Sequence, residues 1–201
     1  MGYARRMNVP NRCGWRGMAG DPQYEAYHDQ EWGVPEYDSR ALWEKLVLDG
    51  FQAGLAWITI LRKREGFRLA FNNFNPDHVA AYGEADRARL MADAGIVRSN
   101  AKIDAAISRA KIFVAMRDRG EDFSAFLWAF VDGVPINRQW SAIGDVPAQT
   151  PVAMEMSKAL KSKGFKFCGP VIVYAFMQAT GMVNDHLTSC FRHPEVVKIA
   201  R

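Results

Sequence analysis

Two cysteines and two histidines of this chain have the chemistry to hold a metal ion. His186 and Cys190 are four residues apart, so on a helix or a tight turn both side chains project to one side. Cys13 and His28 lie far upstream, with 14 residues between them. Together the four side chains have the softness and the number that tetrahedral zinc takes, and such a closed site would tie the N-terminal segment to the C-terminus. The alternative is that these residues are packed or solvated, as lone cysteines and histidines usually are.

The N-terminal third combines aromatic residues with a carboxylate, which suits a flat, cationic ring. Four of the aromatic residues fall in segments that contain glycine or proline: Trp15, Tyr24, Tyr27 and Trp32. Aromatic side chains in such segments often line a pocket, and electron-rich rings attract cations. Asp49 is the candidate carboxylate. The alternatives are core packing for the rings and a solvated helix end for Asp49.

The segment from Pro151 to Val183 has the layout of a helix-hairpin-helix. One apolar helix is interrupted by residues 164–169 (GFKFCG), and Pro170 stands where the next helix would begin. The backbone N–H groups and the helix N-terminus of such a hairpin can bind a DNA phosphate. Residues 156–184 contain four lysines and no acid, which favours contact with a polyanion. An ordinary turn between two helices, capped by glycine, would show the same pattern.

The elements that must position these groups are helices. The apolar spacing predicts helices over residues 55–71, 84–94, 100–117 and 122–131, and a short one from Pro76. It also predicts a helix that Ser39 caps and that Gly50 and Gly54 interrupt. No segment alternates apolar and polar residues between turn signals, so we expect an all-α protein with no sheet of consequence. Residues 137–150 are polar and irregular and are predicted to form a surface loop. His78 and His193 are interpreted as surface residues.

The composition of the chain limits the classes of protein to which it can belong. With 201 residues, 49% hydrophobic and 24% charged, the chain is typical of a soluble globular protein. No uncharged apolar run approaches about 18 residues, which excludes a transmembrane helix, and no apolar stretch follows the N-terminal charges, which argues against a secretory signal. The chain has three cysteines, an odd number that cannot all pair in disulfide bonds. We therefore expect reduced thiols and a cytoplasmic location. We expect a disordered or extended lead over 1–11 and one compact helical domain over 12–201, with two lobes sharing a cleft.

Six segments, in the same order along the chain, resemble the DNA-3-methyladenine glycosylase I family. They are residues 12–15 (RCGW), 24–33 (YEAYHDQEWG), 52–57 (QAGLAW), 163–167 (KGFKF), 177–179 (MQA) and 181–186 (GMVNDH). The likeness runs from Arg12 to Cys190. It implies a helical DNA-repair enzyme of the helix-hairpin-helix glycosylase superfamily, with a structural zinc that closes its ends.

The resemblance also assigns the site residues. The zinc ligands fall on Cys13, His28, His186 and Cys190. The base pocket falls on Trp15, Tyr24, Tyr27, Trp32, Asp49 and Trp57, and the contacts to the DNA backbone fall on Lys163, Gly164, Lys166 and Gly169. The candidate catalytic residues are Asp49 and Tyr27, together with Asp185, which lies near the position of a catalytic aspartate in the wider superfamily.

The activity that the resemblance implies is release of 3-methyladenine, as the free base, from double-stranded DNA containing alkylated bases. No lysine is placed for Schiff-base chemistry, so we expect a monofunctional hydrolase, acting as a monomer and without a membrane partner. The chain departs from the family at Ala56, where serine is common, and at Asp49, where glutamate is typical. The shorter Asp49 side chain recedes by about 1.5 Å, so the hydrogen bond to the base could be lost, bridged by water or restored by a backbone shift.

Two other functions remain open. A zinc-stabilised module could bind alkylated or distorted DNA without cleaving the glycosidic bond, and the aspartate at position 49 keeps that hypothesis open. A nucleotide-binding protein could use the aromatic pocket for a free base. Release of base from methylated DNA separates the enzyme from both.

Overall fold

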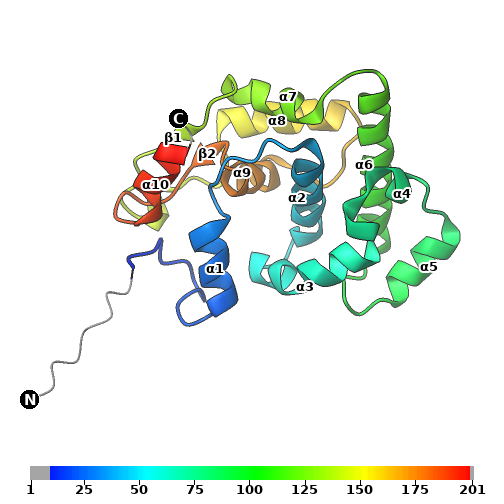
Figure 1. Cartoon of the computed structure of the whole chain (residues 1–201), viewed down its shortest axis with the longest axis horizontal. Coiled ribbons are helices and arrows are strands. Elements are labelled where there is room, and N and C mark those ends of the chain that lie inside the picture. Colours follow the sequence, from blue (N-terminus) through cyan, green and yellow to red (C-terminus); the bar gives the residue numbers. More distant parts are fainter. Residues whose placement is uncertain (1–9, 200–201) are drawn as a thin grey trace, which may run out of the picture.

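The computed structural model describes residues 10–199, in which ten α-helices form most of the structure (Figure 1). Residues 1–9 of the predicted lead lie outside the described residues. The α-helices are α1 (Pro22–Gln30), α2 (Ser39–Gln52), α3 (Trp57–Ala70), α4 (Pro76–Ala80), α5 (Glu84–Ala92), α6 (Asn100–Asp118), α7 (Phe123–Trp128), α8 (Pro151–Ser162), α9 (Pro170–Ala179) and α10 (Arg192–Ile199). Short 3-10 helices add η1 (Asn72–Phe74), η2 (Ala129–Val131) and η3 (Ile143–Asp145). The prediction of a helical protein is confirmed.

Extended pairing within residues 10–199 is confined to two strands of two residues each. β1 (Ile136–Asn137) pairs in parallel with β2 (Val183–Asn184), with Ile136 opposite Val183. This pairing holds the start of the loop after β1 next to the C-terminal segment, to which β2 belongs. As a result Trp140, from a stretch predicted to be an irregular surface loop, reaches the candidate site described below.

The start of helix α2 differs from the prediction by one residue. Asp38, not Ser39, is the N-cap, since its carboxylate accepts a hydrogen bond from the Ala41 N–H at 2.8 Å. The Ser39 hydroxyl instead donates to the Asp122 carboxylate at 2.9 Å and accepts from the Ser124 N–H at 2.9 Å. Ser39 therefore ties the start of α2 to the start of α7.

Gly50 lies inside α2 and does not interrupt it, which corrects the prediction. A Cβ atom at this position would lie 2.5 Å from Nη1 of Arg109 on α6. The glycine thus makes room for the Arg109 guanidinium, which is buried and donates to the Leu46 carbonyl at 2.6 Å. Its Nε donates to the Lys166 carbonyl at 3.0 Å, so one side chain joins α2 to the loop between α8 and α9.

The other predicted helices form, with ends that shift by a residue or two. The helix predicted over 55–71 begins at Trp57, and the one predicted over 84–94 ends at Ala92. The segment 122–131 divides into α7 and η2, because the last turn tightens into a 3-10 helix. None of the helices within residues 10–199 is long and apolar enough to cross a lipid bilayer.

Two hydrophobic clusters support the structure. The larger one lies among α2, α3, α6 and α9 and includes Leu42, Phe67, Ile107 and Phe176. The smaller one gathers residues from both ends of the chain and one from α3: Cys13, Tyr27, Trp32, Leu61, Leu187 and Cys190. In Figure 1 the segment before α1 and helix α10 lie at the same end of the molecule, where this smaller cluster forms.

Candidate active site and metal centre

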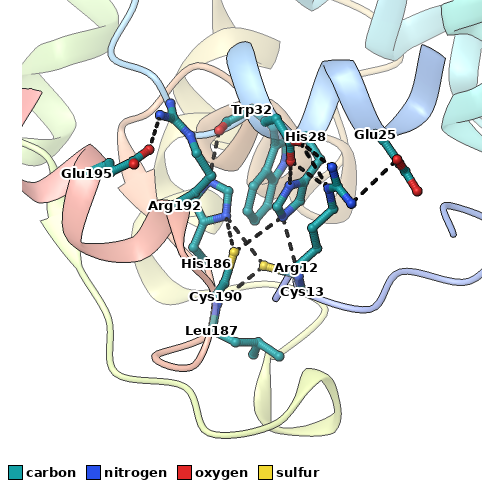
Figure 2. A network of polar contacts seen from close by, with 11 residues as sticks. Arg12, Cys13, Glu25, His28, Trp32, His186, Leu187, Cys190, Arg192 and Glu195 are labelled. Atoms are coloured by element: carbon teal, nitrogen blue, oxygen red, sulfur yellow. Dashed lines mark hydrogen bonds and ion pairs between the residues drawn. The ribbon is translucent and has the colours of Figure 1, made fainter. Parts of the chain in front are cut away.

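The four predicted metal ligands meet in one buried cluster (Figure 2). The ligand atoms of Cys13, His28, His186 and Cys190 all lie within 4.8 Å of one another. The Cys13 Sγ to His186 Nδ1 distance is 3.4 Å, and Cys190 Sγ lies 3.6 Å from both His186 Nδ1 and His28 Nε2. A tetrahedral zinc with its usual bond lengths separates sulfur from nitrogen by about 3.6 Å. The two thiols and two imidazoles therefore have the spacing to hold a metal ion.

Neighbouring groups orient both imidazoles toward the sulfur atoms. His28 Nδ1 donates to the Asp29 carboxylate at 2.8 Å, and Arg12 holds that carboxylate from the other side at 2.7 Å. His186 Nε2 donates to the Trp32 carbonyl at 3.0 Å. Each histidine thus presents its other nitrogen, as a lone pair, to the cluster, which is the arrangement that metal-bound histidines adopt.

The two thiols influence each other strongly. The hydrogen bond from the Cys13 thiol lowers the pKa of Cys190 more than burial raises it, so a thiolate is favoured there. The same contact with Cys190, together with burial, raises the pKa of Cys13. A divalent cation among the four ligands would stabilise both thiolates and release the shared proton.

A cavity of about 380 Å³ opens beside this cluster. All six predicted base-binding residues line it, namely Trp15, Tyr24, Tyr27, Trp32, Asp49 and Trp57. Asp185, predicted as a further catalytic candidate, also lies in its wall. The structure therefore brings together residues from the N-terminal segment, α1, α2, the start of α3 and the C-terminal segment.

The aromatic rings form a continuous lining. Trp15 lies 5.5 Å from Tyr24 and 6.4 Å from Tyr27, measured between ring centroids, and Tyr27 lies 5.4 Å from Trp57. Trp32 packs edge-on against Trp15 at 4.7 Å. The pairs are tilted or edge-on, the geometries that aromatic rings prefer.

Asp49 is the buried carboxylate of this cavity, with 1% of its surface exposed. Its Oδ1 atom is paired with the ammonium of Lys45, one turn earlier on α2, while Oδ2 is buried and has no hydrogen-bond partner among the described residues. Burial raises the pKa of Asp49, and Lys45 and Arg109 oppose that shift. An unsatisfied buried oxygen is costly unless a ligand or water donates to it. Asp49 is thus a free acceptor, not the solvated helix end that was the alternative.

Asp185 is held differently, because both of its carboxylate oxygens accept hydrogen bonds. Trp140 Nε1 donates to Oδ1 at 2.8 Å, while the Tyr174 hydroxyl and Gln178 Nε2 donate to Oδ2 at 2.5 and 2.7 Å. Burial and this hydrogen bond raise the pKa of Tyr174. The geometry makes Asp185 an anchor that joins α9 to the loop after β1.

The α8–α9 hairpin has the predicted helix-loop-helix form. Its loop is braced by the Ser157 hydroxyl, which donates to the Cys168 carbonyl at 2.6 Å, and by Arg109 on the Lys166 carbonyl. Gly164 adopts a φ of +96°, a left-handed value that favours glycine. The Lys166 side chain is exposed, whereas the Lys163 ammonium is paired with Glu121 at 2.7 Å. Of the two predicted phosphate-binding lysines, Lys166 is the one whose ammonium has no ion pair within residues 10–199.

Several residues of the site were not predicted from the sequence. Lys45 lines the cavity, and its position four residues before Asp49 is a spacing that could have identified it. Gln178 and Trp140 both donate hydrogen bonds to Asp185, and only the tertiary structure brings the three residues together. His193 is buried, not on the surface as predicted, because its Nε2 donates to the Arg138 carbonyl at 2.8 Å.

The fold and the site define a helical protein in which a Cys/His cluster adjoins an aromatic cavity with a buried carboxylate. The methyladenine glycosylase family profile matches residues 15–193. DNA-3-methyladenine glycosylase 1 of Escherichia coli K12 is 49% identical over 183 residues, which cover 91% of this chain and 97% of the relative. The chain belongs to the methyladenine glycosylase family.

Solved structures agree with this assignment. A crystal structure of 3-methyladenine DNA glycosylase I superposes with a TM-score of 0.89 at 51% identity and covers 92% of this chain and 100% of its own. The Staphylococcus aureus enzyme, whose structure addresses 3-methyladenine recognition, superposes with a TM-score of 0.84 at 40% identity and covers 87% of this chain and 93% of its own.

Proposed function

We propose that this chain is a monofunctional DNA glycosylase that releases 3-methyladenine from alkylated double-stranded DNA. The observation that carries the proposal is the cavity, in which aromatic rings surround a buried carboxylate, one oxygen of which has no hydrogen-bond partner in the described part of the chain. Membership of the family, and the activity named for its 49% identical relative, support the same reaction.

Recognition begins with extrusion of the damaged nucleotide from the duplex, at a cost of a few kcal/mol. The flipped base enters the cavity and stacks among Trp15, Tyr27 and Trp57. Alkylation at N3 makes adenine cationic, so electron-rich rings favour it over the neutral normal base. The free Oδ2 of Asp49 accepts a hydrogen bond from the polar edge of the base.

The chemical step needs little from the protein because the leaving base is already cationic. The bond between the anomeric carbon and N9 breaks, and its electron pair neutralises the base without any protonation. Water adds to the oxocarbenium-like carbon and loses its proton to solvent, which leaves an abasic site. The ring of Tyr27 stabilises the positive charge, Asp49 holds the base in place through its Oδ2 acceptor, and Asp185 acts as a positioning residue that holds the wall of the cavity.

The remaining groups position the DNA and close the fold. The exposed Lys166 and the backbone N–H groups of the α8–α9 loop, from Gly164 to Gly169, hold the phosphates. The Cys13, His28, His186 and Cys190 cluster holds one zinc ion, since two thiolates and two imidazoles are ligands that zinc prefers. Four protein ligands leave no open position, so this zinc is structural.

The rival function is a module that binds alkylated DNA without cleaving it, and the aspartate at position 49 is the observation behind it. The test is to incubate the purified chain with methylated duplex DNA and to separate any released base by chromatography. The proposed enzyme releases 3-methyladenine, and Trp57→Ala, which removes one wall of the cavity, loses that release. Tight binding of methylated DNA without free base would establish the module and refute the enzyme.

A further inference from the structure

Lys45 places a second charge in the candidate base cavity. It lies one turn before Asp49 on α2, and its ammonium is paired with the Asp49 carboxylate. The same ammonium lies over the Trp57 ring, 4.0 Å from the ring centroid. The side chain is 17% exposed and also forms part of the wall of a neighbouring cavity of about 310 Å³.

These two contacts are the ones that a cationic base would make in this cavity. The Lys45 ammonium already makes the cation–π contact with the Trp57 ring that a cationic base would make. Its ion pair with Asp49 already neutralises the charge of that carboxylate. Burial lowers the pKa of Lys45, but Asp49 opposes that shift, so the ammonium form has a fixed counter-ion. The pair is therefore neutral as a unit, and Asp49 Oδ2, which is buried and has no hydrogen-bond partner among the described residues, is the acceptor left for a neutral donor such as an exocyclic amine.

We propose that Lys45 is a specificity-determining residue of this cavity, whose ammonium lowers the preference for cationic bases relative to neutral ones of the same shape. The inference rests on the proposed base-binding function of the cavity. The ammonium remains in the wall when a base binds, because leaving would strand the buried Asp49 carboxylate without its counter-ion. The ammonium then repels a cationic ligand at close range, whereas a neutral purine has no net charge to be repelled.

The test compares two purines that differ in charge. The probes are 3,9-dimethyladeninium, a permanent cation, and 3-methyladenine, which is neutral as the free base at neutral pH. Calorimetry or fluorescence quenching gives the ratio of their affinities for the wild type, Lys45→Met, Lys45→Arg and the control Lys63→Met. Lys63 is matched for charge but lies on the outer part of α3, where it donates to the Ala94 carbonyl at 2.6 Å.

The expected result is that Lys45→Met raises the cation-to-neutral affinity ratio by about tenfold. Lys45→Arg and Lys63→Met keep the wild-type ratio. If Lys45→Met does not fold, Lys45→Gln gives the same comparison with a polar, uncharged side chain. An unchanged ratio in the uncharged variants, or an equal change in Lys45→Arg or Lys63→Met, overturns the proposal.

A separate arm distinguishes this inference from the proposed function. If the wild type binds neither probe, or if Trp57→Ala binds both as well as the wild type does, the cavity is not the base site and both proposals fail. If Trp57→Ala loses binding while Lys45→Met leaves the ratio unchanged, the base site stands and only the role of Lys45 is wrong.

Discussion

Trp32 packs its indole ring edge-on against the imidazole of His186, with 4.6 Å between the ring centroids. Trp32 lines the cavity, and His186 belongs to the Cys/His cluster. Trp15 has the same double role, because it lines the cavity and packs edge-on against His28 at 4.9 Å. The Cys/His cluster and the aromatic cavity therefore share a wall, so we expect a change in one to alter the other.

Replacing Cys190 with alanine should remove the metal and lower stability together. Three ligands hold zinc far more weakly than four, and metal affinity is coupled to the fold that it closes, so we expect a loss of about 3 kcal/mol or more. Because of the shared wall, affinity for free 3-methyladenine should also fall. Elemental analysis, thermal unfolding and base titration measure the three effects.

The matched control is Cys168→Ala, which removes a buried thiol outside the cluster. Cys168 donates to the Phe165 carbonyl in the hairpin loop, so its loss should cost some stability but leave one zinc per chain. Wild-type protein purified without chelator that contains no zinc would contradict the assignment of the cluster.

Replacing Lys166 with alanine should weaken DNA binding almost equally for all sequences. A phosphate contact carries no sequence information, and its loss lowers the slope of log affinity against log salt by about one contact. Binding of the free base should not change. Lys198→Ala, an exposed lysine on α10, is the control, and a salt slope for Lys166→Ala that matches the wild type would mean that the loop is only a turn.

Arg109→Met tests the connection between the hairpin and the cavity helix. The variant leaves the Leu46 and Lys166 carbonyls without their buried donor, which should lower the free energy of unfolding by about 3 kcal/mol. Burial lowers the pKa of Arg109 to about 10, so the charge is retained at neutral pH in the wild type. Urea denaturation measures the loss, and DNA affinity should fall more than affinity for the free base.

An exposed arginine serves as the comparison for that experiment. Within residues 10–199, Glu121 is the one ion-pair partner of Arg119, at 2.8 Å on the surface, so Arg119→Met should leave the urea midpoint nearly unchanged. Equal losses for the two variants would show that the buried hydrogen bonds of Arg109 contribute nothing special.

The Cys/His cluster and the cavity lining were predictable because residue type and motif carry their chemistry. Residue type alone left core packing or solvation open for these side chains, and the resemblance of the six segments to one family favoured the site. Helical periodicity located α2 and α3, which hold Asp49 and Trp57, but it did not predict α1, which holds Tyr24, Tyr27 and His28. The pairings across the fold were not predictable in this way. Gly50 is a helix residue because Arg109 passes over it, and Lys163 is held by Glu121, and neither contact follows from local spacing.

Asp185→Asn should act on the shape of the cavity more than on the chemistry. Asparagine keeps one acceptor oxygen but presents an NH₂ group to the donors that now bind the carboxylate, Trp140 or the Tyr174–Gln178 pair. We expect lower thermal stability and weaker binding of 3-methyladenine, with the excision rate at saturating DNA reduced less than tenfold. A rate that collapses while stability and base affinity stay at the wild-type level would make Asp185 a catalytic residue.

Asp49 is the position where the chain departs from the glutamate that its resemblance to the family led us to expect. Asp49→Asn removes the charge and misplaces an acceptor, and it leaves Lys45 buried without its partner. Single-turnover release of 3-methyladenine should therefore fall by about tenfold or more, with a loss of stability. Asp49→Glu keeps the ion pair with Lys45 and extends the other carboxylate oxygen toward the base. Release of 3-methyladenine should therefore equal or exceed the wild-type rate. A misplacement of about 1 Å can lower a reaction rate on the order of 100-fold, so the gain could be large enough to measure. If glutamate is slower while asparagine also fails, the cavity is shaped for the shorter acid, and Asp49 still belongs to the site. Equal rates for aspartate, asparagine and glutamate would show that the carboxylate takes no part in the reaction. A hydrogen bond from the base to Oδ2 would be altered by both substitutions.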